Sequence, residues 1–184
     1  MANIAIPYAS GRGHTRRLAE EIAVALGAAE CNARVIDVME MQPTDWQAME
    51  AADAIVMGAP TYMGSVCAEF KSFMDASSEI WADQRWADKM AAGFTVATFA
   101  GGDKLSSLIQ LSIFAAQHGM VWVGQDQLGA PVVKENEGIN QSGTWLGLGA
   151  TSVRDKFLMV SAGDLETARR FGVRIARLAR RWAR

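Results

Sequence analysis

The sequence contains few cysteines, histidines and prolines, and these shortages narrow the classes of protein to which it can belong. Cys31 and Cys67 are its two cysteines. That is too few for the disulfide framework of a small secreted domain, so we expect two reduced thiols. With two histidines and no cysteine cluster, we expect no metal site.

Long hydrophobic runs are also missing. No segment approaches the ~20 apolar residues that cross a bilayer, so we expect no transmembrane segment. The first residues lack the basic region and the long apolar region of a signal peptide. Together these features favour a cytoplasmic protein.

The chain does contain ample material for one hydrophobic core. Of its 184 residues, 50% are hydrophobic and 21% are charged, which is typical of a folded globular protein. The length suits one domain, and no linker or internal repeat divides it. We therefore expect a single domain over residues 1–184.

Short apolar segments alternate with amphipathic ones along the chain. The pattern predicts strands at 4–8, 34–38, 54–57, 94–99 and 120–123, and helices at 15–26, 45–52, 66–77, 105–118 and 165–182. Residues 125–156 are rich in glycine and asparagine and are expected to be irregular. This alternation predicts an α/β domain with a parallel sheet covered on both faces. Ligands of such sheets bind beyond the carboxyl ends of the strands.

The loop after the first predicted strand has the composition of a phosphate cradle. It leads directly into a helix and reads Ser10, Gly11, Arg12, Gly13, His14 and Thr15. Glycines let backbone N–H groups turn inward, and a helix N-terminus adds the positive end of a dipole. Taken alone, the segment is almost as consistent with a glycine-rich turn capped by Thr15.

Two other phosphate motifs fit this loop less well. A P-loop requires a lysine that the segment lacks. A dinucleotide fingerprint could begin at Gly11 and Gly13 and use Asp37 as its acid, but Arg16 stands where the third glycine belongs.

Two further loops follow the third and fourth predicted strands. The first offers apolar surface to a planar ring and contains Pro60, Thr61, Tyr62, Met63 and Gly64. The second has small residues that would let its backbone approach the polar edge of a ring, and it contains Ala97, Thr98, Phe99, Ala100, Gly101 and Gly102.

Taken together, these motifs resemble one known family. Residues 8–19 resemble the FMN phosphate loop of the flavodoxin superfamily. Residues 58–64 and 70–75 resemble its NAD(P)H:quinone oxidoreductase branch, the tryptophan-repressor-binding protein family, and the motifs at 80–81, 100–102 and 118–121 follow in the same order. The resemblance covers nearly the whole chain. It implies a flavodoxin-like, doubly wound, five-stranded parallel sheet in the order 2-1-3-4-5.

The resemblance also implies roles for the motif residues. Residues 10–15 would hold the FMN phosphate, and residues 60–64 and 97–102 would line the isoalloxazine ring. His118 would approach the pyrimidine end of the ring, often from the side of a neighbouring subunit. Trp81 would wall the pocket in which nicotinamide and quinone stack in turn. Tyr62, Trp81 and His118 are thus the expected catalytic residues, in a homodimer or homotetramer.

The implied reaction passes two electrons from NAD(P)H to a quinone by a ping-pong mechanism, with FMN as cofactor. A flavodoxin-type electron carrier and a flavin or azo-dye reductase on the same fold are the alternatives. The sequence departs from the family at Arg12, where relatives often carry an aromatic residue, and at Thr98-Phe99, which replaces a turn richer in glycine.

The C-terminal segment is strongly basic. Residues 169–184 carry seven arginines and no acid, whereas the rest of the chain has a balance of −9. At helical spacing, one face carries Phe171, Ile175, Leu178 and Trp182, and another carries Arg170, Arg174, Arg177 and Arg181. We interpret this segment as a helix that covers the sheet with its arginines outward. A contact with nucleic acid or an anionic membrane is the alternative.

Overall fold

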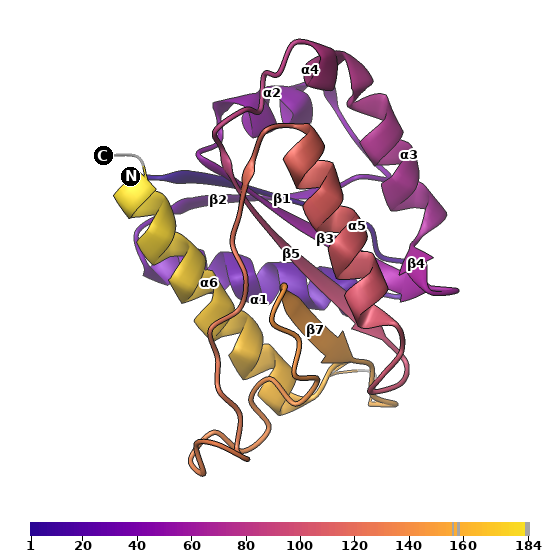
Figure 1. Ribbon diagram of the computed structural model, residues 1–184, viewed down its shortest axis with the longest axis vertical. Helices are drawn as coiled ribbons and strands as arrows, with labels where there is room; N and C mark the ends of the chain where they lie inside the picture. The colour runs from indigo at the N-terminus through magenta and orange to yellow at the C-terminus, as the bar shows by residue number, and fades with distance from the viewer. Residues whose placement is uncertain (156, 158, 183–184) are drawn as a thin grey trace.

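A twisted parallel sheet forms the centre of the molecule in the computed structural model, which describes residues 1–155, 157 and 159–182 (Figure 1). Its strands are β1 (Asn3–Tyr8), β2 (Asn32–Asp37), β3 (Ala54–Tyr62), β5 (Met90–Ala97), β6 (Val121–Trp122) and β7 (Leu148–Thr151). The order β2-β1-β3-β5-β6 is parallel throughout, and β7 also pairs with β5. The predicted 2-1-3-4-5 winding is therefore confirmed.

The fifth position of the sheet is shared by two short strands. β6 pairs with Met90 and Ala91 at the start of β5, and β7 pairs with the last four residues of the same strand. The chain leaves the sheet between them, over residues 123–147, which we call the excursion (Figure 1). The prediction that residues 125–156 are irregular throughout was therefore wrong at β7.

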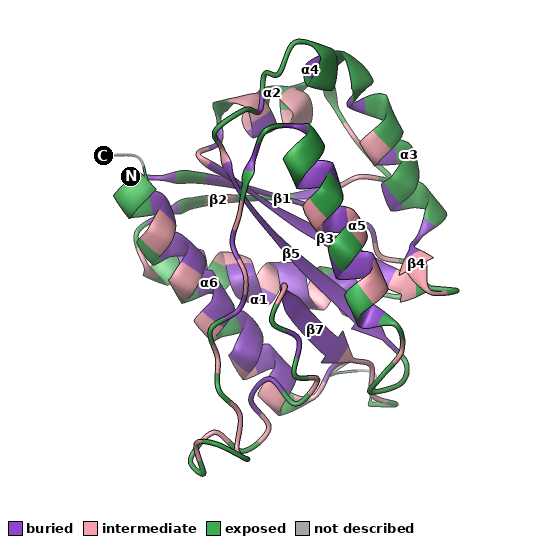
Figure 2. Ribbon diagram, in the orientation of Figure 1, coloured by how far each residue is buried: buried purple, intermediate pink, exposed green. Residues whose placement is uncertain are grey.

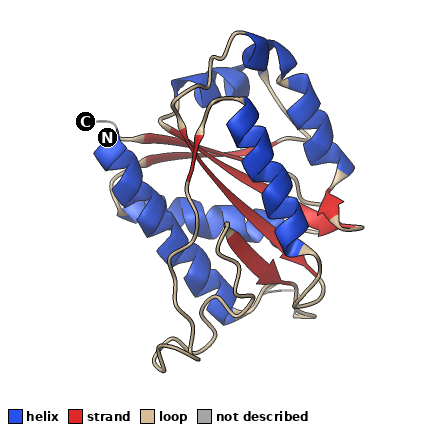
Figure 3. Cartoon of the chain, viewed as in Figure 1, coloured by secondary structure: helices blue, strands red, loops and turns tan. Residues whose placement is uncertain are grey.

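Helices cover both faces of the sheet (Figure 3). On one face lie α1 (His14–Ala28) and α6 (Ala162–Trp182), whose buried side chains share a core cluster with those of β1. The second core cluster takes side chains from the helices of the other face, which are α2 (Pro43–Ala51), α3 (Ala68–Ala76), α4 (Ser78–Ala82) and α5 (Lys104–Gln117).

Burial follows this layered plan (Figure 2). Alternate residues of β1 point to opposite faces, so that Ile4 and Ile6 join the α1–α6 cluster while Ala5 joins the other. Cys31 and Cys67 are buried free thiols, and burial raises the pKa of Cys67 to about 11. No helix in the described part of the chain is both long and apolar enough to cross a membrane.

Several predicted boundaries were wrong. β3 continues through Pro60 to Tyr62, and a short strand β4 (Ser65–Val66) folds back on it, so the helix expected from residue 66 begins at Ala68. β5 occupies 90–97 rather than 94–99. Thr98 and Phe99 therefore belong to the loop that follows the strand, at the end of the sheet where a ligand is expected.

Candidate functional site

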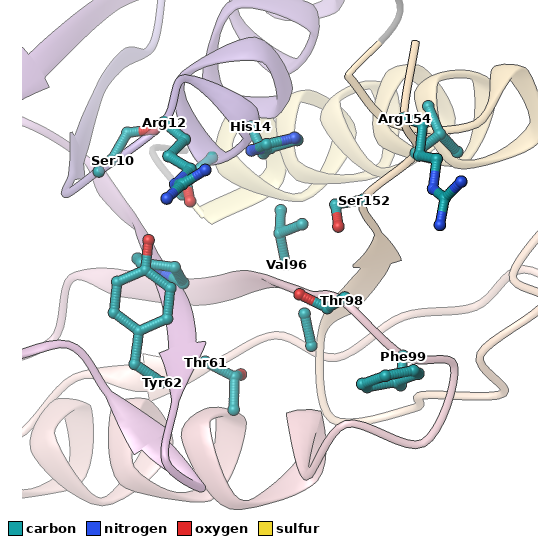
Figure 4. A pocket seen from close by; sticks show the side chains of 15 residues that line it. Ser10, Arg12, His14, Thr61, Tyr62, Val96, Thr98, Phe99, Ser152 and Arg154 are labelled. Carbon is teal, nitrogen blue, oxygen red and sulfur yellow. The ribbon is translucent and has the colours of Figure 1, made fainter. Parts of the chain in front are cut away.

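A cavity of about 880 Å³ opens at the carboxyl ends of the central strands (Figure 4). Many of its lining residues were predicted from the sequence, namely Ser10, Gly11, Arg12, His14, Thr15, Pro60, Thr61, Tyr62, Ala97, Thr98 and Phe99. The other lining residues are Val96, Ser152, Val153 and Arg154. The loops after β1, β3, β5 and β7 thus meet at one site.

Ser10 and Gly13 set the conformation of the loop after β1. Ser10 Oγ accepts hydrogen bonds from the backbone N–H of Gly13 at 3.0 Å and of Arg16 at 3.3 Å. Gly13 caps α1 with a φ of 90°, a conformation that L side chains rarely adopt. A Cβ atom at Gly13 would lie 3.1 Å from the thioether of Met159.

The same loop presents unpaired backbone donors. Among the described residues, no protein acceptor bonds the N–H groups of Gly11, Arg12, His14 and Thr15. They lie at the start of α1, where the helix dipole favours an anion. The described residues that line the cavity include two arginines, Arg12 and Arg154, and no acidic residue. The residues present therefore fit a phosphate group.

Tyr62 lies over this loop from the opposite side. Its hydroxyl is 2.8 Å from the position that a Cβ atom of Gly11 would occupy, and Figure 4 shows the ring directed toward Ser10 and Arg12. Tyr62 is 49% exposed, so one side of the ring remains open. Met63 and Gly64 form the turn between β3 and β4 and do not line the cavity, because the Met63 side chain points fully into solvent.

The loop after β5 forms the far wall. Thr98 and Phe99 line the cavity, whereas Ala100 and Gly101 line a neighbouring cavity of about 610 Å³, and Gly102 lines neither. Behind the wall, Thr61 Oγ1 forms 2.8 Å hydrogen bonds with the hydroxyls of Thr95 and Ser107. This buried network fixes the end of β3 against β5 and α5.

Sequence reasoning missed the contribution of the last strand. Ser152, Val153 and Arg154 reach the cavity because they follow β7, and Ser152 N–H donates to Ala97 O at 2.9 Å. The usable signal was the rule that ligand-binding loops follow parallel strands. It was not applied here because residues 148–151 were not recognised as a strand.

The structure does not place His118 or Trp81 at this cavity. Both line a separate pocket of about 260 Å³ beneath α3, α4 and α5. The reason is the direction of α5, which starts beside the loop after β5 and runs back along the sheet. Its last turn therefore lies near the amino ends of the strands, at the end of the sheet opposite the cavity. His118 therefore does not reach the cavity of its own chain, and the predicted approach to the FMN ring would have to come from a neighbouring subunit.

His118 is instead part of the core. It is 1% exposed and its ring packs against Trp86 and Phe114. Ser77 Oγ donates to Met74 O at 2.7 Å, so its single proton is used and His118 Nε2, 2.9 Å away, must donate to it. Burial lowers the pKa of His118 to about 4, so the ring is neutral at pH 7.

The rival dinucleotide site is not supported by the surroundings of the loop. Asp37, its expected acid, accepts hydrogen bonds from Tyr8 Oη at 3.2 Å and from the Met39 N–H at 3.0 Å. Arg16 turns outward and pairs with Glu20. Within the described residues, no group of three His, Cys, Asp or Glu side chains is placed to hold a metal ion.

Comparison with known proteins agrees with this geometry. The family model described as "NADPH-dependent FMN reductase" matches residues 2–134, which include three of the four loops that form the cavity. The chain belongs to the NADPH-dependent FMN reductase family. The name of the family agrees with a cavity that has a loop with unpaired N–H groups at one end and Tyr62 and Phe99 along its walls.

Individual relatives and a solved structure extend the comparison. "Flavodoxin FldP" of Pseudomonas aeruginosa is 36% identical, with 97% of both chains covered. An "NAD(P)H dehydrogenase (quinone)" of Archaeoglobus fulgidus is 29% identical over 97% of this chain and 98% of its own. The crystal structure of a flavodoxin, WrbA-like protein from Agrobacterium tumefaciens superposes with a TM-score of 0.77 at 38% identity, covering 98% of this chain and 99% of that one.

Proposed function

We propose that this member of the FMN reductase family is an FMN-dependent oxidoreductase that passes two electrons from NAD(P)H to a quinone. The observation that carries the proposal is the open cavity at the carboxyl ends of the strands, in which a loop that fits a phosphate lies beside a half-exposed Tyr62. Relatives named NAD(P)H dehydrogenase (quinone), similar over almost their full length, support the choice of donor and acceptor.

Bound FMN would supply the hydride chemistry, as flavins do, so the protein has to bind, orient and shield. The N–H groups of the loop after β1 would hold the phosphate, and Thr98 and Phe99 would flank the ring. Phe99 is 75% exposed and Tyr62 is half-exposed, which leaves apolar surface for a second planar molecule. One such surface serves donor and acceptor in turn, which is the geometry of a ping-pong mechanism.

A second candidate function is that of an electron-carrying flavodoxin. The specific observation in its favour is the 36% identity with flavodoxin FldP over nearly the whole of both chains. Carriers of this kind exchange electrons with partner proteins rather than with nicotinamide. A flavin or azo-dye reductase differs from the first proposal only in its acceptor, and the same experiment separates the three.

The deciding experiment is anaerobic stopped-flow absorbance of the FMN-loaded protein. We expect NADPH or NADH to bleach the visible absorbance of bound FMN rapidly and benzoquinone, in a second mix, to restore it. Bleaching without recovery by quinone, but with recovery by a flavin or azo dye, would identify the other reductase. Bound FMN that neither nicotinamide bleaches would favour the electron carrier.

We further propose that the active form is a homodimer or homotetramer in the cytoplasm. Trp81 is 49% exposed and lies away from the cavity of its own chain, so it can wall an FMN site only if a second copy presents it. Sedimentation velocity should then show an assembly, and Trp81→Ala should slow turnover while FMN stays bound. A monomer that turns over normally would refute this role.

A further inference from the structure

A buried charge lies beside the cavity, on a residue that the proposed reaction does not use. Lys104, the first residue of α5, is 1% exposed. Its Nζ donates three hydrogen bonds of 2.8 Å, to Ala100 O, Ser142 Oγ and Thr151 Oγ1. An ammonium group has three donors, so this group is fully satisfied in its charged form.

The three acceptors come from three segments of the chain. Ala100 lies in the loop after β5, directly after Phe99 of the cavity wall. Ser142 belongs to the excursion. Thr151 ends β7, directly before the three residues that complete the cavity. Lys104 thus ties two cavity-lining loops to each other and to the excursion.

An acid completes the arrangement on the far side of Thr151. Asp164, in the first turn of α6, is 3% exposed, and its Oδ2 accepts the Thr151 N–H at 3.0 Å. Burial lowers the pKa of Lys104, and the charge of Asp164 opposes that shift. Burial also raises the pKa of Asp164, and the Thr151 hydrogen bond opposes it.

Gly149 leaves space for the Lys104 side chain. The Lys104 stem passes over β7, where a Cβ atom on Gly149 would lie 3.2 Å from Lys104 Cδ. Burying a lysine and a carboxylate is costly, and a well-packed apolar pair often serves stability better. Stability alone therefore explains this pair poorly, and its position at the cavity wall suggests a role there.

We propose that Lys104 and Asp164 are positioning residues of the FMN site, which hold the loops after β5 and β7 in register and set the local charge beside the bound ring. The inference deepens the proposed function, because it needs FMN in the cavity, but it does not depend on which electron acceptor is used.

The two charges give the proposal a test that loss of packing cannot mimic. Lys104→Met removes the positive charge and keeps a long apolar stem, whereas Asp164→Asn removes the negative charge and keeps the shape. A reduced flavin carries more negative charge than an oxidised one, so the nearby cation favours reduction and the anion opposes it. At the effective dielectric constant of about 20 that suits protein sites, we expect each of these charges to change the equilibrium by about tenfold.

The experiment measures the two-electron reduction potential of bound FMN against a reference dye, and the dissociation constant of FMN by fluorescence quenching. For Lys104→Met we expect FMN to bind about tenfold more weakly and the reduced-to-oxidised affinity ratio to fall about tenfold, which lowers the potential by about 30 mV. For Asp164→Asn we expect the potential to rise. Lys104→Arg, which keeps the charge, should hold the potential near that of the wild-type protein.

Ser142→Ala keeps the proposal testable if the charge variants unfold, because it deletes one acceptor of Lys104 and leaves both charges in place. It should weaken FMN binding by a few-fold without moving the potential. Unchanged FMN affinity and potential in all folded variants would overturn the proposal, as would shifts of the same sign for Lys104→Met and Asp164→Asn. If FMN binds and responds as expected but no nicotinamide reduces it, only the proposed oxidoreductase function fails.

Discussion

Gly13 fixes the conformation of the loop after β1, which we propose holds the FMN phosphate. Its φ of 90° and the nearby Met159 thioether both oppose any side chain. An alanine there costs about 1–2 kcal/mol of backbone strain. We expect the free loop of Gly13→Ala to relax out of this conformation and FMN binding to weaken by roughly tenfold, because FMN must then restore it and 1.4 kcal/mol corresponds to a factor of ten. The measurement is fluorescence titration of the apoprotein with FMN.

The matched control is Gly27→Ala in the same helix. A Cβ atom on Gly27 meets nothing within 4 Å, so the alanine should add about 0.5–1 kcal/mol of stability through helix propensity and leave FMN affinity unchanged. Equal FMN affinity for both variants and the wild-type protein would remove the loop from the cofactor site.

His118 makes the stability of the fold depend on pH. Its folded pKa of about 4 lies below the unfolded value of about 6.5, so protonation favours the unfolded chain. The contribution is therefore complete above pH 6.5 and falls as the pH drops toward 4. Between pH 7.5 and pH 5 the free energy of unfolding should decrease by about 2 kcal/mol on this account, measured by urea denaturation.

One variant assigns that pH dependence to the His118 ring. His118→Gln should be less stable than the wild-type protein at pH 7.5, because it disturbs a buried hydrogen bond, but its loss of stability between pH 7.5 and pH 5 should be about 2 kcal/mol smaller. If His118→Gln kept the full dependence, His118 would not be the titrating group.

At the scale of elements, Arg170 and Arg174 of α6 hold the excursion against that helix. Arg174 Nε donates to Gly124 O at 2.8 Å and its Nη1 to Asp126 Oδ2 at 2.7 Å. Arg170 Nη1 donates to Asn136 Oδ1 at 2.8 Å further along. We expect Arg174→Ala to cost about 1–3 kcal/mol, because it leaves the Gly124 carbonyl without its charged donor and leaves Asp126 paired with Arg177 alone. Amide hydrogen exchange should accelerate at residues 124–127.

Lys71→Ala provides the comparison for an ordinary exposed ion pair. Lys71 pairs with Asp75 one helical turn away, and both side chains are more than half exposed. Such a pair contributes about 0.3–0.5 kcal/mol. If Arg174→Ala cost no more than Lys71→Ala and left exchange in the excursion unchanged, the arginine contacts would be incidental.

The alternation of strands and helices was predictable because its signal is local. β7 was not, because its sequence Leu-Gly-Ala-Thr has little strand propensity, and its conformation comes from pairing with the free edge of β5. Pro60 was assigned to a loop, yet it continues β3. The loop residues Ser10 to Thr15 were predictable for the opposite reason, since glycines before a helix specify their own geometry.

At the scale of the whole molecule, a motif along the chain does not reveal which end of the sheet it reaches. The motifs at 100–102 and 118–121 both resemble the family, but between them α5 carries the chain from the carboxyl ends of the strands to their amino ends. Residue types therefore predicted which residues of the loop after β1 line the cavity, whereas the placement of Trp81 and His118 required the three-dimensional path.

The distribution of charge over the whole molecule argues against the alternative of a contact with nucleic acid. Four arginines of α6 form ion pairs within the chain: Arg169 with Glu21, Arg170 with Glu166, and both Arg174 and Arg177 with Asp126. The remainder of the chain is acidic. A duplex would have to compete with these carboxylates for each guanidinium group.

We therefore expect no binding of duplex DNA at 50 mM salt, measured by fluorescence anisotropy of a labelled oligonucleotide. A double variant, Asp126→Asn with Glu166→Gln, removes two of the internal partners and should acquire weak binding that disappears at 200 mM salt. Binding by the wild-type protein, with log K falling linearly against log salt, would show that phosphates displace the internal acids. If neither protein binds, the acidic remainder of the surface is what prevents binding, because it repels a polyanion whether or not the arginines are paired.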